Sequence, residues 1–285
     1  MQSRNPVFNR AEGFNGRSAG AATFPGHHDQ YGAGQYGAGG AYGAPTTTGT
    51  DRMTIDTVVQ KTAVTLGVLI VAAAATWYLT PDITSQQAAS TLYTVSIVGA
   101  LGGFALSMVN SFKKVVSPPL VLLYAALQGL FVGAFSKTVT TIFGNPDDGV
   151  FGSIVMGAVL GTMAAVAGTL AAYKFFDIKV GTKFRKWVVG MMFGFVAVSL
   201  LDFVLGFFHA DFGFNGFGTM GFISSIIGLG LGVLMLILDF DFVERGIAAG
   251  LPERESWRAA FGLTVTIVWI YIELLRILAI LRGND

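Results

Sequence analysis

A few charged side chains interrupt the long apolar segments of this sequence, and they are its clearest candidates for chemistry. These residues are Asp202, Asp239, Asp241, Glu273 and Arg276. A charge among apolar residues must be paired, neutralised or hydrated, and carboxylates held in this way bind cations or exchange protons. Ion or proton binding is therefore the chemistry that these residue types indicate.

Asp239 and Asp241 end an apolar run, and their spacing separates their roles. Residues two apart on a helix point about 200° away from each other, so the two carboxylates face different ways. Asp241 has Arg245 four residues later, and we expect these two to form a solvated pair at the helix end. Asp239 is then the candidate for an ion- or proton-binding group inside the protein. The alternative is that Asp239 extends to water at the cytoplasmic end.

Glu273 and Arg276 are three residues apart, a spacing at which side chains can neutralise each other on a helix. A structural ion pair is one interpretation, and a charged plug whose pairing responds to pH or ion occupancy is the other. Asp202 should lie at a similar depth. It is either an aspartate of an outer vestibule, or it faces Glu273 so that the two carboxyls share a proton.

The elements that position these charges are membrane-spanning helices. Only 12% of the 285 residues are charged and 53% are apolar, with a mean hydropathy of +0.62, whereas a soluble domain carries about 25% charged residues. Crossing a bilayer takes about 20 helical residues, and the alternation of barrel strands is missing. Seven segments qualify: 62–81, 83–112, 115–136, 149–173, 187–209, 212–238 and 259–281. We predict an all-α, seven-span bundle; six spans with a re-entrant last stretch is the alternative.

Glycine spacing predicts how these helices pack. Five of the segments contain two glycines four residues apart, which lets helix backbones approach closely in a membrane. The pairs are Gly99/Gly103, Gly129/Gly133, Gly157/Gly161, Gly190/Gly194 and Gly228/Gly232.

The segments on the two sides of the membrane differ in their number of Lys and Arg residues, which predicts the orientation of the protein. With the N-terminus inside, 15 of the 18 Lys and Arg residues fall on the cytoplasmic side, as expected for a multi-pass protein of the cytoplasmic membrane.

Residues 1–52 repeat Tyr-Gly-Ala and hold few large apolar residues. We therefore predict a disordered cytoplasmic tail before a membrane domain at 53–285.

Several function classes lack their required residues. Cysteine is absent, the three histidines include no HExxH motif, and no Walker motif occurs. We therefore expect neither an enzyme nor a bound cofactor. The net charge of +1 gives no reason to expect a nucleic-acid partner, and the expected partner is the lipid bilayer.

Four stretches, in this order and spacing, resemble the Bax inhibitor/YccA family in its bacterial, actinobacterial-like branch. They are Ser117-Pro-Pro-Leu with Ala126-Leu-Gln-Gly-Leu-Phe-Val-Gly133, Gly161-Thr-Met-Ala with Ala171-Ala-Tyr, Leu238-Asp-Phe with Val243, and Tyr271-Ile-Glu-Leu-Leu-Arg-Ile-Leu278. The resemblance implies six helices around a central last helix. It also implies a calcium leak that pH controls through paired aspartates in the sixth and seventh spans.

The resemblance assigns roles to particular residues. Asp239 matches the sixth-span aspartate, but the seventh-span aspartate position falls near Thr266, and a third-span glutamate is Gln128 here. Asp239 with Gln128, Thr266 and water would bind calcium weakly, and weak binding suits conduction. Glu273 and Arg276 would form a second charged element.

Two functions are compatible with these features. The first hypothesis is a pH-sensitive passive leak for calcium or another cation, with calcium as the transported ion. The alternative, also implied by the resemblance, is a non-conducting regulator that binds a membrane-anchored ATP-dependent protease in membrane-protein quality control. The tail at residues 1–52 would then present an unfolded end to the protease.

Overall fold

The structure, a computed structural model, describes residues 52–145, 149 and 152–283. The chain divides into two units, Met1–Thr46 and Thr47–Asp285, and every described residue belongs to the second. Apart from Arg52, the predicted disordered tail lies outside the described residues.

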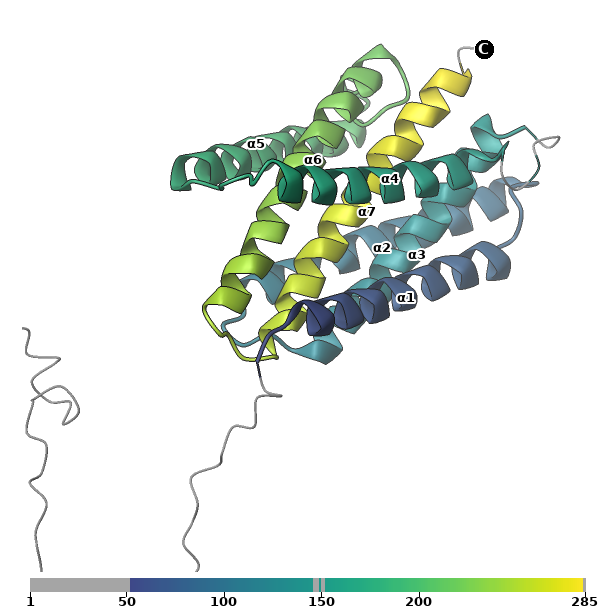
Figure 1. Ribbon diagram of the computed structural model, residues 1–285. Helices are drawn as coiled ribbons and strands as arrows, with labels where there is room; N and C mark the ends of the chain where they lie inside the picture. Colours follow the sequence, from purple (N-terminus) through teal and green to yellow (C-terminus); the bar gives the residue numbers. More distant parts are fainter. Residues whose placement is uncertain (1–51, 146–148, 150–151, 284–285) are drawn as a thin grey trace, which may run out of the picture. The chain divides into compact units, whose positions relative to one another are not determined.

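Seven α-helices make up most of the described part of the chain (Figure 1). They are α1 (Ile55–Leu79), α2 (Gln86–Phe112), α3 (Pro118–Phe143), α4 (Ile154–Phe175), α5 (Thr182–Gly206), α6 (Thr219–Ala248) and α7 (Glu255–Gly283). Each is long and apolar enough to cross a membrane. This confirms the all-α, seven-span prediction.

The sixth apolar segment differs most from its predicted bounds. Residues 207–218 form a linker rather than the start of a helix, and His209 and Gly213 adopt positive φ angles of 54° and 79° within it. Such angles end a right-handed helix. α6 then continues well past Asp239, to Ala248. The aspartates near position 240 therefore lie within the helix and not at its end.

α7 is the most buried of the seven helices and occupies the centre of the bundle. It packs against α1, α3, α4 and α6, whereas α2 packs on α3 and α5 packs on α6 at the periphery (Figure 1). With 29 residues, α7 is roughly 43 Å long and continuous. This confirms a central last helix, and the re-entrant alternative is wrong.

Four of the five predicted glycine pairs lie at helix contacts. A Cβ at Gly99 would lie 2.6 Å from the backbone nitrogen of Phe131 on α3, and one at Gly157 would lie 3.1 Å from a Leu278 methyl on α7. The pairs in α3 and α6 meet α1 and α7 in the same way. The prediction is wrong for Gly190 and Gly194, because no atom lies within 4 Å of a Cβ built at either position.

Polar contacts tie the linker that leads into α7 to two other parts of the predicted cytoplasmic end. The Met53 amide donates to the Leu251 carbonyl at 2.8 Å, and Lys61 forms an ion pair with Glu253. On the other side, Arg254 donates to the Val116 carbonyl at 3.0 Å. These contacts set the position of α7 against α1 and against the linker between α2 and α3.

Candidate functional site

Asp239 of α6 makes a direct contact with α7. Its Oδ2 accepts a hydrogen bond of 2.6 Å from the Thr266 hydroxyl. The two helices can approach here because residue 262 is glycine: a Cβ at Gly262 would lie 3.2 Å from Asp239 Oδ1. The structure thus joins two residues that the sequence places on one candidate ion path.

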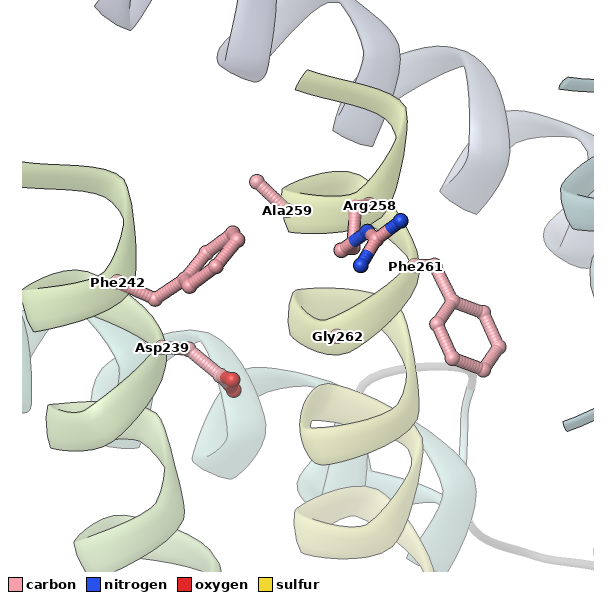
Figure 2. Close-up of a pocket in the computed structure, with 6 residues that line it drawn as sticks. All are labelled: Asp239, Phe242, Arg258, Ala259, Phe261 and Gly262. Carbon is pink, nitrogen blue, oxygen red and sulfur yellow. The ribbon is translucent and has the colours of Figure 1, made fainter. Parts of the chain in front are cut away.

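A cavity of about 190 Å³ opens beside Asp239. Its lining residues come from α6 and α7: Asp239, Phe242, Arg258, Ala259, Phe261 and Gly262. Figure 2 shows the Asp239 carboxylate directed toward α7, with Arg258 about one turn before Gly262. The Arg258 guanidinium pairs with Glu255 at 2.9 Å and donates to the Lys114 carbonyl at 2.8 Å. The cavity therefore combines one carboxylate, one guanidinium and apolar walls.

Gln128, the third residue of the predicted ion path, lies elsewhere. Its side chain faces α2, where a Cβ at Gly103 would lie 2.6 Å from the Gln128 Oε1. In the described part of the chain no hydrogen bond joins Gln128 to Asp239 or Thr266. The short contact between α2 and α3 explains this direction, because glycine leaves room for the amide between the two helices.

Across the described ranges, no three His, Cys, Asp or Glu side chains lie close enough together to hold a metal ion. Stable calcium sites use 6–8 oxygen ligands. Asp239 and Thr266 together offer fewer oxygen atoms than such a site uses.

The polar side chains that α7 directs toward α6 share one helix face. They recur every three or four residues: Thr266, Trp269, Glu273 and Arg276. Trp269 Nε1 donates to the Gly228 carbonyl of α6 at 2.9 Å, and a Cβ at Gly228 would lie 2.7 Å from Glu273 Oε1. We call the row formed by Asp239, Thr266, Trp269, Glu273 and Arg276 the polar seam.

Glu273 and Arg276 end the polar seam as a buried ion pair. Arg276 Nη1 lies 3.1 Å from Glu273 Oε2, and the two residues are only 6% and 4% exposed. Arg276 Nη2 also donates to the Phe214 and Gly216 carbonyls, at 2.8 and 3.1 Å. The structure thus contains the ion pair that the spacing suggests, and adds backbone partners from the linker between α5 and α6.

Asp202 binds the same linker and not Glu273. It is 3% exposed, and its two oxygens accept hydrogen bonds from the amides of Phe212 and Asn215, at 2.9 and 2.8 Å. Glu273 is engaged with Arg276. The idea that Asp202 and Glu273 share a proton is therefore wrong for this arrangement.

Asp241 differs from its predicted role as a solvated residue. It pairs with Arg245 as expected, but it is only 7% exposed and also pairs with Arg185 of α5 at 2.9 Å. The second arginine comes from 56 residues away in the chain, so the spacing within α6 could not reveal it. Asp241 connects α5 to α6.

Comparison with known families agrees with this architecture. The family model described as Bax inhibitor 1 like matches residues 5–283. The chain belongs to this family. With the seven helices above, membership makes it a multi-pass integral membrane protein. A comparison with curated proteins finds no match.

The Bax inhibitor 1-like chain also contains a buried lysine that is not among the candidates predicted from the sequence. Lys137 of α3 is 6% exposed. Its ammonium donates to the Thr80 and Trp77 carbonyls at the end of α1, at 2.7 and 3.0 Å, and lies 3.0 Å from Asp82. A cation is favourable at a helix C-terminus. Its isolation within an apolar stretch is the sequence signal that could have identified it.

The contact at Thr266 allows a first test of the site in this Bax inhibitor 1-like protein. In Thr266→Asp, a second carboxyl would lie beside Asp239, and two carboxylates so close repel each other strongly. We expect the variant to lose thermal stability relative to wild type as the pH rises, because the proton that the two carboxyls share is then removed. Thermal unfolding in detergent at several pH values measures this.

The uncharged variant Thr266→Asn is the matched control for this experiment. It has nearly the same shape as Thr266→Asp but adds no titrating group. A pH dependence of equal size in both variants would contradict the contact between residues 239 and 266.

Proposed function

We propose that this protein is a passive cation leak, with calcium as the first ion to test, in which the polar seam carries the ion. The main support is the contact between Asp239 and Thr266 beside a cavity shared by α6 and α7. A carboxylate and a hydroxyl offer oxygen ligands that suit hard cations. Because these ligands are few, the cation would bind weakly enough to leave, as conduction requires.

The same geometry supports a response of the leak to pH. Asp239 is the acidic side chain of the cavity, and Arg258 is the charged group that faces the cavity from α7. Protonation of Asp239 would remove the negative charge that attracts the cation while Arg258 stays positive. We therefore propose that flux falls as the pH is lowered.

Calcium flux into proteoliposomes tests this proposal. Full-length wild type and Asp239→Asn are reconstituted at equal density, and flux is followed with a trapped calcium dye at several pH values. We expect about tenfold lower flux in Asp239→Asn at high pH, the factor that corresponds to about 1.4 kcal/mol of lost attraction. At low pH the two proteins should converge, because asparagine mimics the protonated aspartate.

The control is Asp177→Asn, which removes an exposed carboxylate in the linker between α4 and α5, on neither of the two helices that form the seam. Asp177 has a positive φ of 44°, a conformation that asparagine also tolerates. This control should conduct like wild type. If Asp239→Asn shows the wild-type pH profile, Asp239 has no role in the leak. A folded, inserted wild type without flux would favour the non-conducting protease regulator instead.

A further inference from the structure

The linker between α5 and α6 folds into the predicted outer end of the bundle. Residues 213–217 are half-buried, while the residues on both sides are exposed; we call residues 213–217 the plug. Phe214 packs on Phe195 of α5 and Phe217 packs on Phe143 of α3, with ring centroids 5.0 and 4.9 Å apart. The plug thus contacts the side chains of two different helices.

Two buried charges of opposite sign hold the plug by its backbone. Asp202 of α5 accepts hydrogen bonds from the amides of Phe212 and Asn215. Arg276 of α7 donates to two carbonyls of the plug, at 2.8 and 3.1 Å. The backbone of the linker therefore lies between the Asp202 carboxylate and the Arg276 guanidinium. Each of these two charged groups has hydrogen-bond partners in that backbone. Hydrogen bonds to charged groups are the stronger kind.

The plug meets the end of the polar seam through Arg276. The guanidinium that binds the plug also pairs with Glu273, and Ser224 of α6 donates to the Phe214 carbonyl at 2.6 Å. Water that reached Arg276 from this end would therefore first have to displace the plug.

The contacts of the plug are also reversible. They are hydrogen bonds and ring contacts, and water can replace the hydrogen bonds at little enthalpic cost once it enters. Gly213 at φ 79° and Gly216 lie within the plug, and glycine gives the backbone more conformations to move through. The segment can thus leave its position without any helix unfolding.

We propose that the plug is a gate at the predicted outer end of the polar seam, closed in this structure and held by Asp202 and Arg276. When the plug leaves, water reaches Glu273 and Arg276 and the seam opens. This rests on the proposed function in that the seam carries the ion.

Accessibility of a single cysteine tests the gate without relying on flux. The chain has no cysteine, and Ser225 of α6 is fully buried and lies beside Glu273 of the polar seam, so Ser225→Cys supplies one thiol of similar size there. A membrane-impermeant, positively charged thiosulfonate reagent is added to the full-length protein in vesicles. Adding Asp202→Asn should speed labelling at least about tenfold, because the loss of a hydrogen bond to a charged group favours the open plug by about that factor. Adding Asp177→Asn instead should leave the rate unchanged.

A milder variant keeps the test decisive if Asp202→Asn does not fold. Ser199 of α5 donates from its hydroxyl to the side chain of Asn215 at 2.7 Å, so Ser199→Ala loosens the plug without removing a charge. It should also speed labelling, though by a smaller factor. Unchanged labelling in every folded variant would overturn the gate.

Calcium flux in the same variants separates the gate from the leak. Faster labelling together with higher flux supports both proposals. Faster labelling without flux in any protein keeps the gate as a moving segment and overturns the leak. Flux that depends on Asp239, with unchanged labelling, keeps the leak and overturns the gate.

Discussion

Replacing Arg276 with methionine is expected to lower the free energy of unfolding by about 3–5 kcal/mol, a large share of the stability of a folded protein. Methionine fills similar space but leaves the Glu273 carboxylate buried without its cation. Removing one partner of a buried ion pair is costly because the remaining charge is neither hydrated nor paired. Thermal or denaturant unfolding in detergent, followed by tryptophan fluorescence, measures the loss.

The double variant Glu273→Gln/Arg276→Met shows whether the lone charge causes this loss. It also leaves the plug carbonyls without Arg276, but it carries no buried carboxylate at position 273. We therefore expect it to be clearly more stable than Arg276→Met. If the two unfold alike, the backbone contacts of Arg276 and not its pairing with Glu273 stabilise the fold. Lys179→Met, at a residue whose side chain is 86% exposed, is the control and should change stability by less than about 0.5 kcal/mol.

The second large effect is expected from adding one methyl group between α2 and α3. In Gly99→Ala the new Cβ would lie 2.6 Å from the Phe131 nitrogen and 2.9 Å from the Leu127 carbonyl oxygen. Both are backbone atoms, so no side-chain rotation relieves the contact and α2 must move away from α3. Overpacking of this kind costs about 1–3 kcal/mol. Unfolding in detergent should show this loss for Gly99→Ala.

Gly190→Ala in α5 is the matched control for the substitution in α2. Both changes replace a glycine inside a helix with alanine and gain the same helix propensity, about 1 kcal/mol. At Gly190 the new methyl meets nothing within 4 Å, so this variant should be as stable as wild type or more stable. Equal loss of stability in both variants would contradict the close α2–α3 contact.

The fold could be predicted from the sequence because lipid restricts the choice of structures. Long apolar runs must form helices in a bilayer, and each of the seven contains one here. The linker at 207–218 was harder to recognise, since its many phenylalanines give it the composition of a span. Its glycines and positive φ angles show that these phenylalanines belong to a folded linker at the end of the bundle.

The candidate site was predictable in part. The pairing of Asp239 with Thr266 agrees with the position that the family resemblance implied for a second acidic residue. The rest of the polar seam has a signal in the sequence, because its polar residues recur at three- and four-residue intervals on α7. This signal can be recognised only when all the residues of that helix face are considered together. Arg185 beside Asp241 has no such signal, because tertiary packing alone brings it there.

The central position of α7 has a consequence for how the protein is made. Chains are synthesised from the N-terminus, and membrane helices insert before they pack. α1, α2 and α3 can associate early, since α1 and α2 each contact α3, but the helix that completes the core is the last of the seven to leave the ribosome. Until then Asp239 lacks Thr266 and the plug lacks Arg276. We therefore expect a chain that stops before Glu255 to carry unpartnered polar groups within the membrane and to be less stable than the full chain.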